Sequence, residues 1–302
     1  MGFGGTMEVD AWGPEHVDAA AVAVDAALDA GIRWFDHADI YRHGRAEIVF
    51  GEVLARWSGI RERIGIQTKC GIRLARGGLP GMYDLRAETI AARVRDSLAR
   101  LRVDYLDVLL LHRPDPLAEP AEIARALTRL HAEGLIRQVG VSNMSGAQIA
   151  ELQRHLKLPL VANQLEMSLH RRAWLEAGVL LNTAESARTG FPHGTLEYCA
   201  AHGVALQAWG PLAQGRYTGR PETPQDRDAA AMVAELAAAK GTTPETVVLW
   251  WLRRHPSRPA PVIGTTNPDR IRACRDAVTR EPDLTHEEWY ELWIAARGTP
   301  IP

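Results

Sequence analysis

The sequence predicts a single (β/α)8 (TIM) barrel over residues 1–302, with one extra helix near its C-terminus. Short apolar segments alternate with helical patterns eight times along the chain, and no linker or shift in composition separates two halves. Several apolar segments are near-continuous, as expected of parallel strands covered on both faces. An open doubly wound sheet is the main alternative. It normally carries a GxGxxG motif after its first strand, and the sequence has none.

Seven apolar segments that end in polar or small residues are predicted as strands. They are residues 33–36, 64–69, 105–112, 136–143, 160–166, 204–210 and 261–265. An eighth, very short strand is expected at residues 1–4. Stretches rich in alanine, leucine and arginine are predicted as helices. They are residues 16–30, 46–57, 87–101, 119–132, 147–156, 195–202, 226–240 and 244–255, and the extra helix covers residues 285–297.

The bulk composition excludes several classes of protein. The chain has 302 residues, 46% of them hydrophobic, and a formal net charge of −2, so nothing drives it toward nucleic acid or a membrane. No secretory leader and no long apolar run are present. The three cysteines lack CxxC spacing, which indicates a reducing cytoplasm rather than a disulfide scaffold or a metal site. We expect a cytoplasmic enzyme without a metal, and a monomer by default.

Ionisable side chains gather where the predicted strands end. Asp36, Lys69 and His112 close three successive strands, and Tyr41 follows Asp36 closely. Active sites of (β/α)8 barrels form at the carboxyl ends of the strands. Lys69 is one of only three lysines in a chain that otherwise uses arginine. A buried lysine in such a chain indicates chemistry that needs a movable pKa.

These four side chains suit the reduction of a carbonyl group. A phenol is a poor acid at neutral pH, but a neighbouring ammonium favours its ionised form. Lys69 can therefore lower the pKa of Tyr41, while Asp36 neutralises Lys69. His112 can hydrogen-bond a carbonyl oxygen and hold it toward the tyrosine. Hydride must then come from a bound cofactor.

Six motifs in order resemble the aldo-keto reductase family. They are Phe35-Asp36-His37-Ala38-Asp39-Ile40-Tyr41, Thr68-Lys69, Tyr105-Leu106-Asp107-Val108-Leu109-Leu110-Leu111-His112, Gly140-Val141-Ser142-Asn143, Asn163-Gln164 and Pro261-Val262-Ile263-Gly264-Thr265-Thr266. The resemblance covers residues 2–270 and is closest to a branch of bacterial oxidoreductases.

The resemblance implies a (β/α)8 barrel that binds NADPH and reduces aldehydes or ketones to alcohols. By family analogy Tyr41 is the proton donor, Lys69 lowers its pKa, Asp36 orients Lys69 and His112 positions the substrate carbonyl. The remaining motif positions match the family's cofactor-binding residues. Ser142, Asn143 and Gln164 match the carboxamide site, and Trp209 matches the ring that stacks on nicotinamide. The pyrophosphate loop is matched by Gly210, Pro211, Leu212, Gln214 and Gly215. The segment that meets the adenosine 2′-phosphate is matched by Ile263, Gly264, Thr265, Thr266 and Arg270, and Gly4 belongs to the glycine-rich start.

The sequence departs from the family pattern in three places. Gly264 replaces a lysine that many relatives carry, so Arg270 is the clearest phosphate ligand and NADH remains possible beside NADPH. Ala273 and Cys274 replace residues that often meet adenine. Relatives also carry a hairpin ahead of residues 2–5, so either the barrel bottom is uncapped or the start of the chain has been assigned too late.

Two other functions remain open. One is an aldolase-type lyase that uses Lys69 as a Schiff base. The other is a non-catalytic subunit that senses the cofactor. The substrate of a reductase is a small carbonyl compound whose identity the sequence does not reveal. Trp12 and residues 73–83 and 171–192 are the expected pocket walls.

Overall fold

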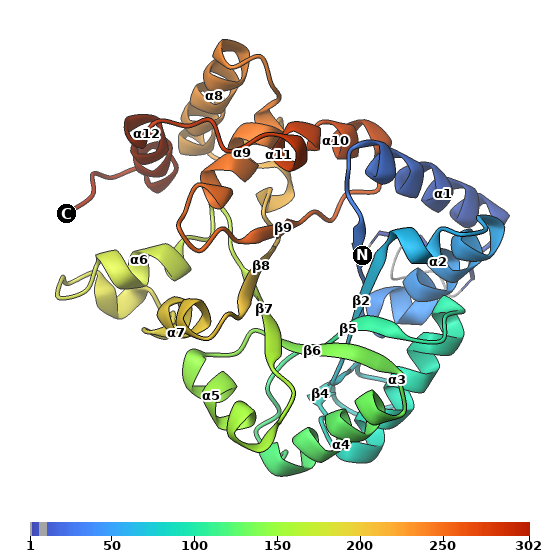
Figure 1. The fold of residues 1–302 in the computed structure, drawn as a ribbon. Helices are drawn as coiled ribbons and strands as arrows, with labels where there is room; N and C mark the ends of the chain where they lie inside the picture. The colour runs from blue at the N-terminus through green and yellow to red at the C-terminus, as the bar shows by residue number, and fades with distance from the viewer. Residues whose placement is uncertain (1, 6–10) are drawn as a thin grey trace. The chain divides into compact units, whose positions relative to one another are not determined.

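The computed structural model describes residues 2–5 and 11–302, which form two compact units. The first unit comprises Met1–Leu28 and Ile32–Asn163, and the second comprises Asp29–Gly31 and Gln164–Pro302. Figure 1 shows strands followed by helices in both. Residues 2–5 form a turn and a bend rather than the predicted eighth strand, and Met1 lies outside the described residues.

Four parallel strands form the centre of the first unit. They are neighbours in the order β1 (Trp34–Asp36), β2 (Gly65–Cys70), β5 (Leu106–Leu111) and β6 (Ile136–Ser142). The helices of this unit are α1 (Pro14–Asp29), α2 (Arg45–Arg56), α3 (Ala87–Leu101), α4 (Pro120–Ala132) and α5 (Gly146–His155), with the short turns η1 (Tyr41–Gly44) and η2 (Arg61–Arg63). These bounds confirm the predicted elements to within one or two residues.

Helices α2 to α5 follow one another along the outer side of these strands (Figure 1). The apolar run of β5 is buried on both of its faces, because Leu109 and Leu111 as well as Val108 and Leu110 are hidden from solvent. Gly51 lets α2 approach α3, since a Cβ atom there would lie 2.3 Å from the carbonyl oxygen of Arg100.

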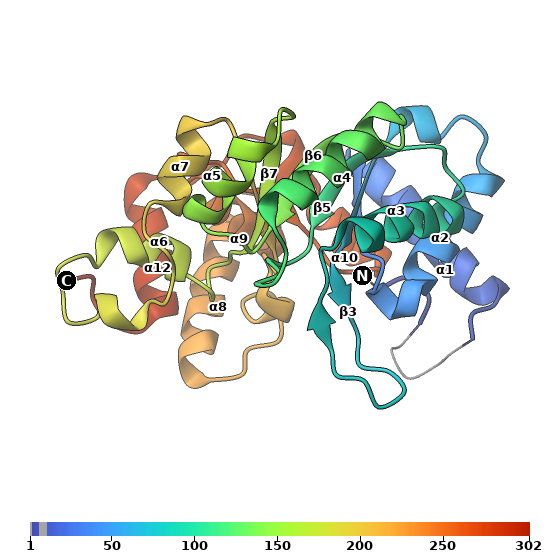
Figure 2. The same ribbon diagram turned by 90° about the horizontal axis from the view of Figure 1, so that it is seen from below.

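The stretch expected as a pocket wall at residues 73–83 forms a hairpin that the sequence did not predict. Strand β3 (Ile72–Arg73) pairs antiparallel with β4 (Met82–Tyr83). Gly77 and Gly78 both have positive φ and form its tip. The hairpin extends away from the helices of its unit (Figure 2). Strands of two residues are too short for alternation to be visible in a sequence.

The second unit contains the rest of the predicted strands. They are β7 (Leu160–Glu166), which begins in the first unit, β8 (Ala205–Trp209) and β9 (Ala260–Val262). Strand β9 ends three residues earlier than predicted. The helices are α6 (Ala173–Val179), α7 (Thr195–Ala201), α8 (Pro224–Ala239), α9 (Pro244–Arg253), α10 (Pro268–Arg272), α11 (Arg275–Thr279) and α12 (His286–Arg297), with the turns η3 (Ser186–Arg188) and η4 (Ala213–Gly215). The short helices α6, α10 and α11 were not predicted.

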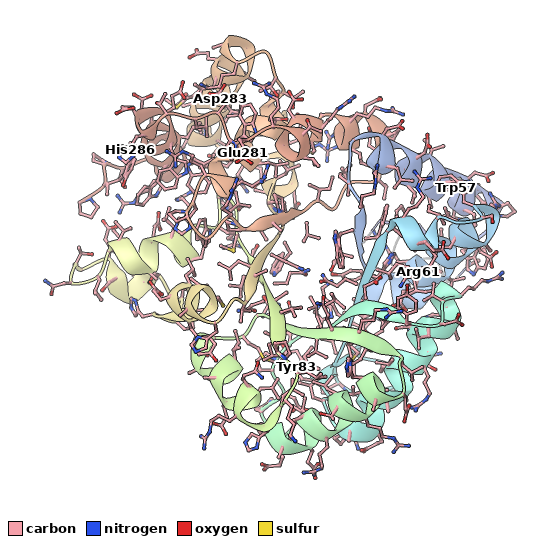
Figure 3. All side chains as sticks on the ribbon, in the orientation of Figure 1. Trp57, Arg61, Tyr83, Glu281, Asp283 and His286 are labelled. Atoms are coloured by element: carbon pink, nitrogen blue, oxygen red, sulfur yellow. The ribbon has the colours of Figure 1, made fainter. Side chains whose placement is uncertain are left out.

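Helix α12 confirms the predicted extra helix, and ionic contacts tie its start to the second unit. Thr285 caps it in a reciprocal hydrogen-bonding arrangement with Glu288. The Lys240 ammonium lies 3.0 Å from Glu288 and 3.8 Å from Asp283, and Glu281 pairs with Arg258. Figure 3 labels Glu281, Asp283 and His286 in this region.

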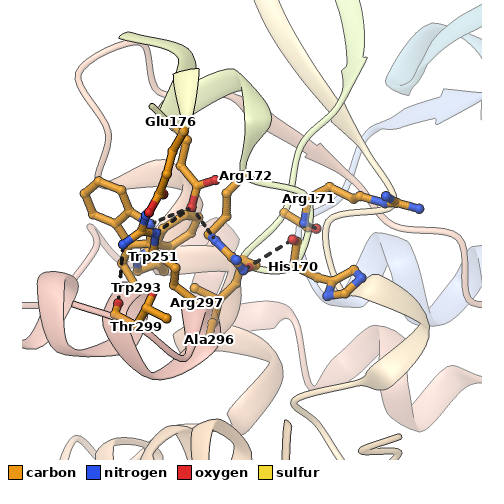
Figure 4. Close-up of polar contacts among 12 residues, drawn as sticks. His170, Arg171, Arg172, Glu176, Trp251, Trp293, Ala296, Arg297 and Thr299 are labelled. Atoms are coloured by element: carbon orange, nitrogen blue, oxygen red, sulfur yellow. Dashed lines mark hydrogen bonds and ion pairs between the residues drawn. The ribbon is translucent and has the colours of Figure 1, made fainter. Parts of the chain in front are cut away.

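The apolar side of α12 packs on aromatic rings of the same unit. Trp289 stacks on Trp251 with ring centroids 5.1 Å apart, and each indole N–H donates to the other residue's carbonyl oxygen. At its far end, Trp293 donates to the Glu176 carboxylate, which also accepts from Arg172 (Figure 4). The helix is therefore an integral part of the second unit.

Candidate active site

The loop that follows β1 is bound by its backbone to the end of β2. The backbone amide of His37 donates to the carbonyl oxygen of Gln67 at 2.8 Å. The backbone amide of Asp39 donates to the carbonyl oxygen of Lys69 at 3.0 Å. Tyr41 begins the turn η1 directly after this loop. The parallel pairing of β1 with β2 thus brings Asp36, Tyr41 and Lys69 together in the first unit.

Lys69 lies at the centre of this site and is only 1% exposed. Its ammonium donates to Asp36 Oδ2 at 2.6 Å, to the carbonyl oxygen of His37 at 2.8 Å and to the Tyr41 hydroxyl at 3.3 Å. These three acceptors match the three protons of an ammonium group. The buried cation is therefore both neutralised and fully hydrogen-bonded.

The pKa values of Lys69 and Tyr41 reflect two opposed effects, burial and the charges of neighbouring groups. Burial lowers the pKa of Lys69, but Asp36 and then Tyr41 outweigh it, so the net pKa is above the ordinary value. Burial raises the pKa of Tyr41, and Lys69 only partly opposes this, so that pKa is also above its ordinary value. The ammonium lowers the phenol pKa, as expected, while burial of the phenol raises it by more.

His112 follows β5, and its ring faces Tyr41. The two rings are edge-to-face with centroids 6.0 Å apart. Burial, and then the charge of Lys69, lowers the pKa of His112 to about 3, so the imidazole is neutral at physiological pH. Its Nδ1 is buried and has no hydrogen-bond partner in the described part of the chain.

Gln67 is a site residue that the sequence analysis missed. It is 3% exposed, and its Nε2 donates to Asp36 Oδ1 at 2.6 Å. It lies two residues before Lys69 on β2, so both side chains point to the same face of the strand. That spacing was the only signal in the sequence.

Two further buried groups lie in the loop that carries Tyr41. His37 is 1% exposed beside Phe50, and neither ring nitrogen has a hydrogen-bond partner among residues 2–5 and 11–302. Burial lowers its pKa to about 3. Burial raises the pKa of Asp39 to about 7, although Arg93 lies 3.6 Å away.

The predicted cofactor residues of the first unit occupy two places. Asn143 has a left-handed backbone (φ 57°). Its side-chain Nδ2 donates to Ser142 Oγ at 2.7 Å and to the carbonyl oxygen of His112 at 3.4 Å. These contacts join the ends of β5 and β6. Gly4 lies apart from them, against the first turn of α2, where its carbonyl oxygen accepts from Arg45.

In the second unit, Gln164 is buried and donates to Gln207 Oε1 at 2.9 Å. Trp209 ends β8 and is half-buried. The loop Gly210–Gly215 then includes two non-glycine residues with a left-handed backbone, Ala213 and Gln214. Such strained conformations are frequent in loops that clamp ligands. Pro211 and Leu212 lie in this loop. The backbone amide of Gly215 closes the loop by donating to the carbonyl oxygen of Leu212.

The segment after β9 is not a strand. Residues 263–266 have no regular structure, which corrects the predicted strand end at Thr265, and they lead into α10. Asn267 caps that helix by accepting from the amides of Asp269 and Arg270. Arg270 makes no ion pair with any residue that the structure describes.

Comparisons with known proteins give a consistent result. The model described as Aldo/keto reductase family matches residues 1–294. The chain is 36% identical to a 6-dehydroglucose reductase of Novosphingobium aromaticivorans, over 94% of this chain and 87% of the relative. It is 36% identical to the oxidoreductase YdhF of Escherichia coli, over 92% and 88% of the two chains.

Solved structures confirm the predicted fold class. A glycerol dehydrogenase from Gluconobacter oxydans matches with a TM-score of 0.79 and 25% identity, over 99% of this chain and 91% of that one. An aldo-keto reductase from Bacillus halodurans matches with a TM-score of 0.72 and 26% identity, over 93% and 87%. In the described part of the chain, no helix combines the length and the apolar character needed to span a membrane.

Proposed function

Because this chain belongs to the aldo/keto reductase family, it is an NAD(P)H-dependent oxidoreductase, and we propose that it reduces aldehydes or ketones with NADPH and with Tyr41 as the proton donor. The observation that carries this proposal is the hydrogen bond from the Lys69 ammonium to the Tyr41 hydroxyl. Lys69 occupies the phenol oxygen as a donor, so the phenol proton is directed toward another acceptor.

That acceptor is the carbonyl oxygen of the substrate. Negative charge develops on this oxygen as hydride arrives at the carbonyl carbon, and Tyr41 neutralises it by giving up its proton. The ammonium of Lys69 stabilises the phenolate that remains. Asp36 keeps Lys69 protonated, because the carboxylate raises the pKa of the amine.

His112 holds the substrate oxygen without acting as an acid. Its imidazole is neutral, so it can donate one N–H to the carbonyl oxygen and keep its proton during the reaction. Its ring lies edge-to-face with that of Tyr41. An oxygen within hydrogen-bonding distance of both groups would be oriented before proton transfer begins.

Each unit by itself holds residues that fit a part of nicotinamide dinucleotide phosphate. Bound NADPH supplies the hydride. Asn143 presents an ordered amide beside the carbonyl oxygen of His112, and Ser142 would assist it in holding the carboxamide. In the second unit, Trp209 offers a partly exposed ring, and the guanidinium of Arg270 remains available for a phosphate.

The surroundings of Lys69 do not suit a Schiff-base lyase. Amine attack on a carbonyl needs a neutral lysine, whereas Asp36 raises the pKa of Lys69 above its ordinary value. All three ammonium protons also have acceptors.

We further propose that residues 1–302 act as one domain in the cytoplasm and as a monomer. The free, buried state of Cys70, Cys199 and Cys274 supports a reducing compartment.

NADPH oxidation by the wild-type enzyme tests the proposal. The panel of carbonyl compounds should include 6-dehydroglucose, because two relatives, at 36% and 34% identity, carry that name. We expect NADPH-dependent turnover on at least one member, and no covalent adduct on Lys69 after borohydride treatment. Tight NADPH binding without any turnover would instead indicate a cofactor sensor, and a borohydride-trapped adduct would indicate a lyase.

A further inference from the structure

Gln67 and Asp36 face each other across two neighbouring strands. They are register partners in the parallel pairing of β1 with β2. Lys69 lies on the same face of β2, two residues further on. On the other side, Val108 pairs with Gln67 and Leu110 pairs with Lys69. Both are buried and apolar.

The Asp36 carboxylate receives two short hydrogen bonds from β2. Gln67 Nε2 donates to Oδ1 at 2.6 Å, and Lys69 Nζ donates to Oδ2 at 2.6 Å. A donor on each oxygen fixes the plane of the carboxylate. Hydrogen bonds to a charged group are stronger than neutral ones, and burial strengthens them further.

The contact between Lys69 and Tyr41 is the longest of the three made by the ammonium, at 3.3 Å against 2.6 and 2.8 Å. A carboxylate that can rotate would draw the ammonium onto both of its oxygens and away from the phenol. A neutral donor on Oδ1 prevents this without adding a charge to the site.

We propose that Gln67 is a positioning residue for carbonyl reduction, which holds the Asp36 carboxylate so that Lys69 stays within reach of Tyr41. The proposal rests on the proposed function, because it concerns the same proton transfer. Gln67 acts through Asp36 and Lys69 and does not itself touch the substrate.

Replacement by an apolar residue should weaken catalysis and leave binding intact. For Gln67→Leu we expect kcat for carbonyl reduction to fall about 30-fold, less than the roughly 100- to 10,000-fold that general acid catalysis contributes in full, because Tyr41 and Lys69 are still present. KM for the carbonyl and Kd for NADPH, measured by fluorescence, should change less than about twofold.

Gln67→Glu gives a more specific signature. When its carboxyl group is protonated it can still donate to Asp36, but when ionised it repels Asp36 and attracts Lys69. We expect kcat of this variant to approach the wild-type value at acid pH and to fall about 30-fold as the second carboxyl ionises. A merely structural role would produce no such pH dependence.

Thr68→Val is the matched control. Thr68 is the next residue on β2, equally buried, but it points to the opposite face and donates to Glu47 at 2.6 Å. This variant should lose stability in urea unfolding and retain kcat within about twofold.

The last measurement needs neither cofactor nor turnover. The tyrosinate absorbance of the cofactor-free protein is titrated with and without Tyr41→Phe, so that the difference isolates Tyr41. In the Gln67→Leu background we expect Tyr41 to ionise at higher pH than in the wild type. An unchanged Tyr41 titration, or equal loss of kcat in folded Gln67→Leu and Thr68→Val, would overturn the proposal. A wild type without reductase activity would overturn the proposed function alone.

Discussion

The two faces of β2 carry two buried charge clusters with opposite roles. On one face, Lys69 pairs with Asp36 and reaches Tyr41. On the other, the Glu47 carboxylate accepts from Thr68, from Ser97 and from Arg100. Each cluster pairs a carboxylate with a cation, and one partner of each pair, Lys69 or Glu47, is almost fully buried, so buried charge alone does not distinguish an active site from a structural ion pair.

The difference lies in how far each cluster is closed to solvent. Each Glu47 oxygen has at least one donor, at 2.6 to 3.2 Å, and the side chain is closed to solvent. The Lys69 cluster instead includes the half-buried Tyr41 phenol and the His112 ring, whose Nδ1 has no partner within the described residues. The half-buried phenol of Tyr41, next to a satisfied ion pair, gives this face a polar group that a substrate can reach.

The largest expected effect is on the catalytic face. Lys69→Met removes the cation that stabilises the phenolate and leaves Asp36 without its main partner. We expect kcat for NADPH-dependent carbonyl reduction to fall at least about 1000-fold. If kcat of the folded variant fell less than tenfold, the Lys69 cluster would be no more important for catalysis than the Glu47 cluster.

A change in the Glu47 cluster should instead alter the free energy of unfolding. Glu47→Gln removes a buried charge that Arg100 neutralises, and we expect the free energy of unfolding to fall by about 3 kcal/mol. The measurement is urea unfolding, with kcat as the control. A loss of kcat as large as that of Lys69→Met would contradict the division between the faces.

His37 should make the loop beneath Tyr41 sensitive to acid. The folded protein keeps His37 neutral down to about pH 3, whereas the unfolded chain gains a proton below pH 6.5. The unfolded state therefore binds more protons in this range, and stability falls as the pH falls from 6.5. Between pH 6.5 and 5 we expect a loss of about 2 kcal/mol from this residue.

Comparison of wild type with His37→Leu in unfolding experiments at both pH values measures that contribution. The variant keeps the backbone carbonyl that accepts from Lys69. An identical pH dependence in the two proteins would refute it.

Asp39 should have a smaller effect with the opposite sign. Burial raises its folded-state pKa from 3.8 to about 7, so the stability linked to its protonated form is complete below pH 3.8 and is lost as the pH rises through 7. Asp39→Asn should therefore gain stability over wild type on going from pH 6 to pH 8. We expect about 1 kcal/mol, because pH 6 lies about one pH unit below the folded-state pKa. Thermal unfolding at the two pH values would measure this gain, and no gain at pH 8 would contradict it.

The sequence predicted the parts of this site that depend on the position of residues along strands. Asp36 and Lys69 end or nearly end neighbouring parallel strands, and chain order alone therefore placed them together. The long strands and helices were predicted because their apolar runs and helical patterns are visible along the chain. The two-residue strands of the hairpin β3–β4 and the five-residue helix α10 carry too little periodicity to be recognised.

Other features depend on tertiary structure. The contact of Gln67 with Asp36 follows from the register of β1 on β2, which no local pattern specifies. The direction of the Tyr41 pKa follows from burial of the phenol, which outweighs the ammonium beside it. Charges can be read from a sequence, but the loss of solvent around them cannot.

The most direct test of the central claim is NADPH-dependent reduction of an accepted carbonyl by Tyr41→Phe, with NADPH binding followed by fluorescence. If Tyr41 is the proton donor, the variant should bind NADPH within about twofold of wild type and lose at least about 100-fold in kcat. Full turnover without the phenol hydroxyl would contradict the account.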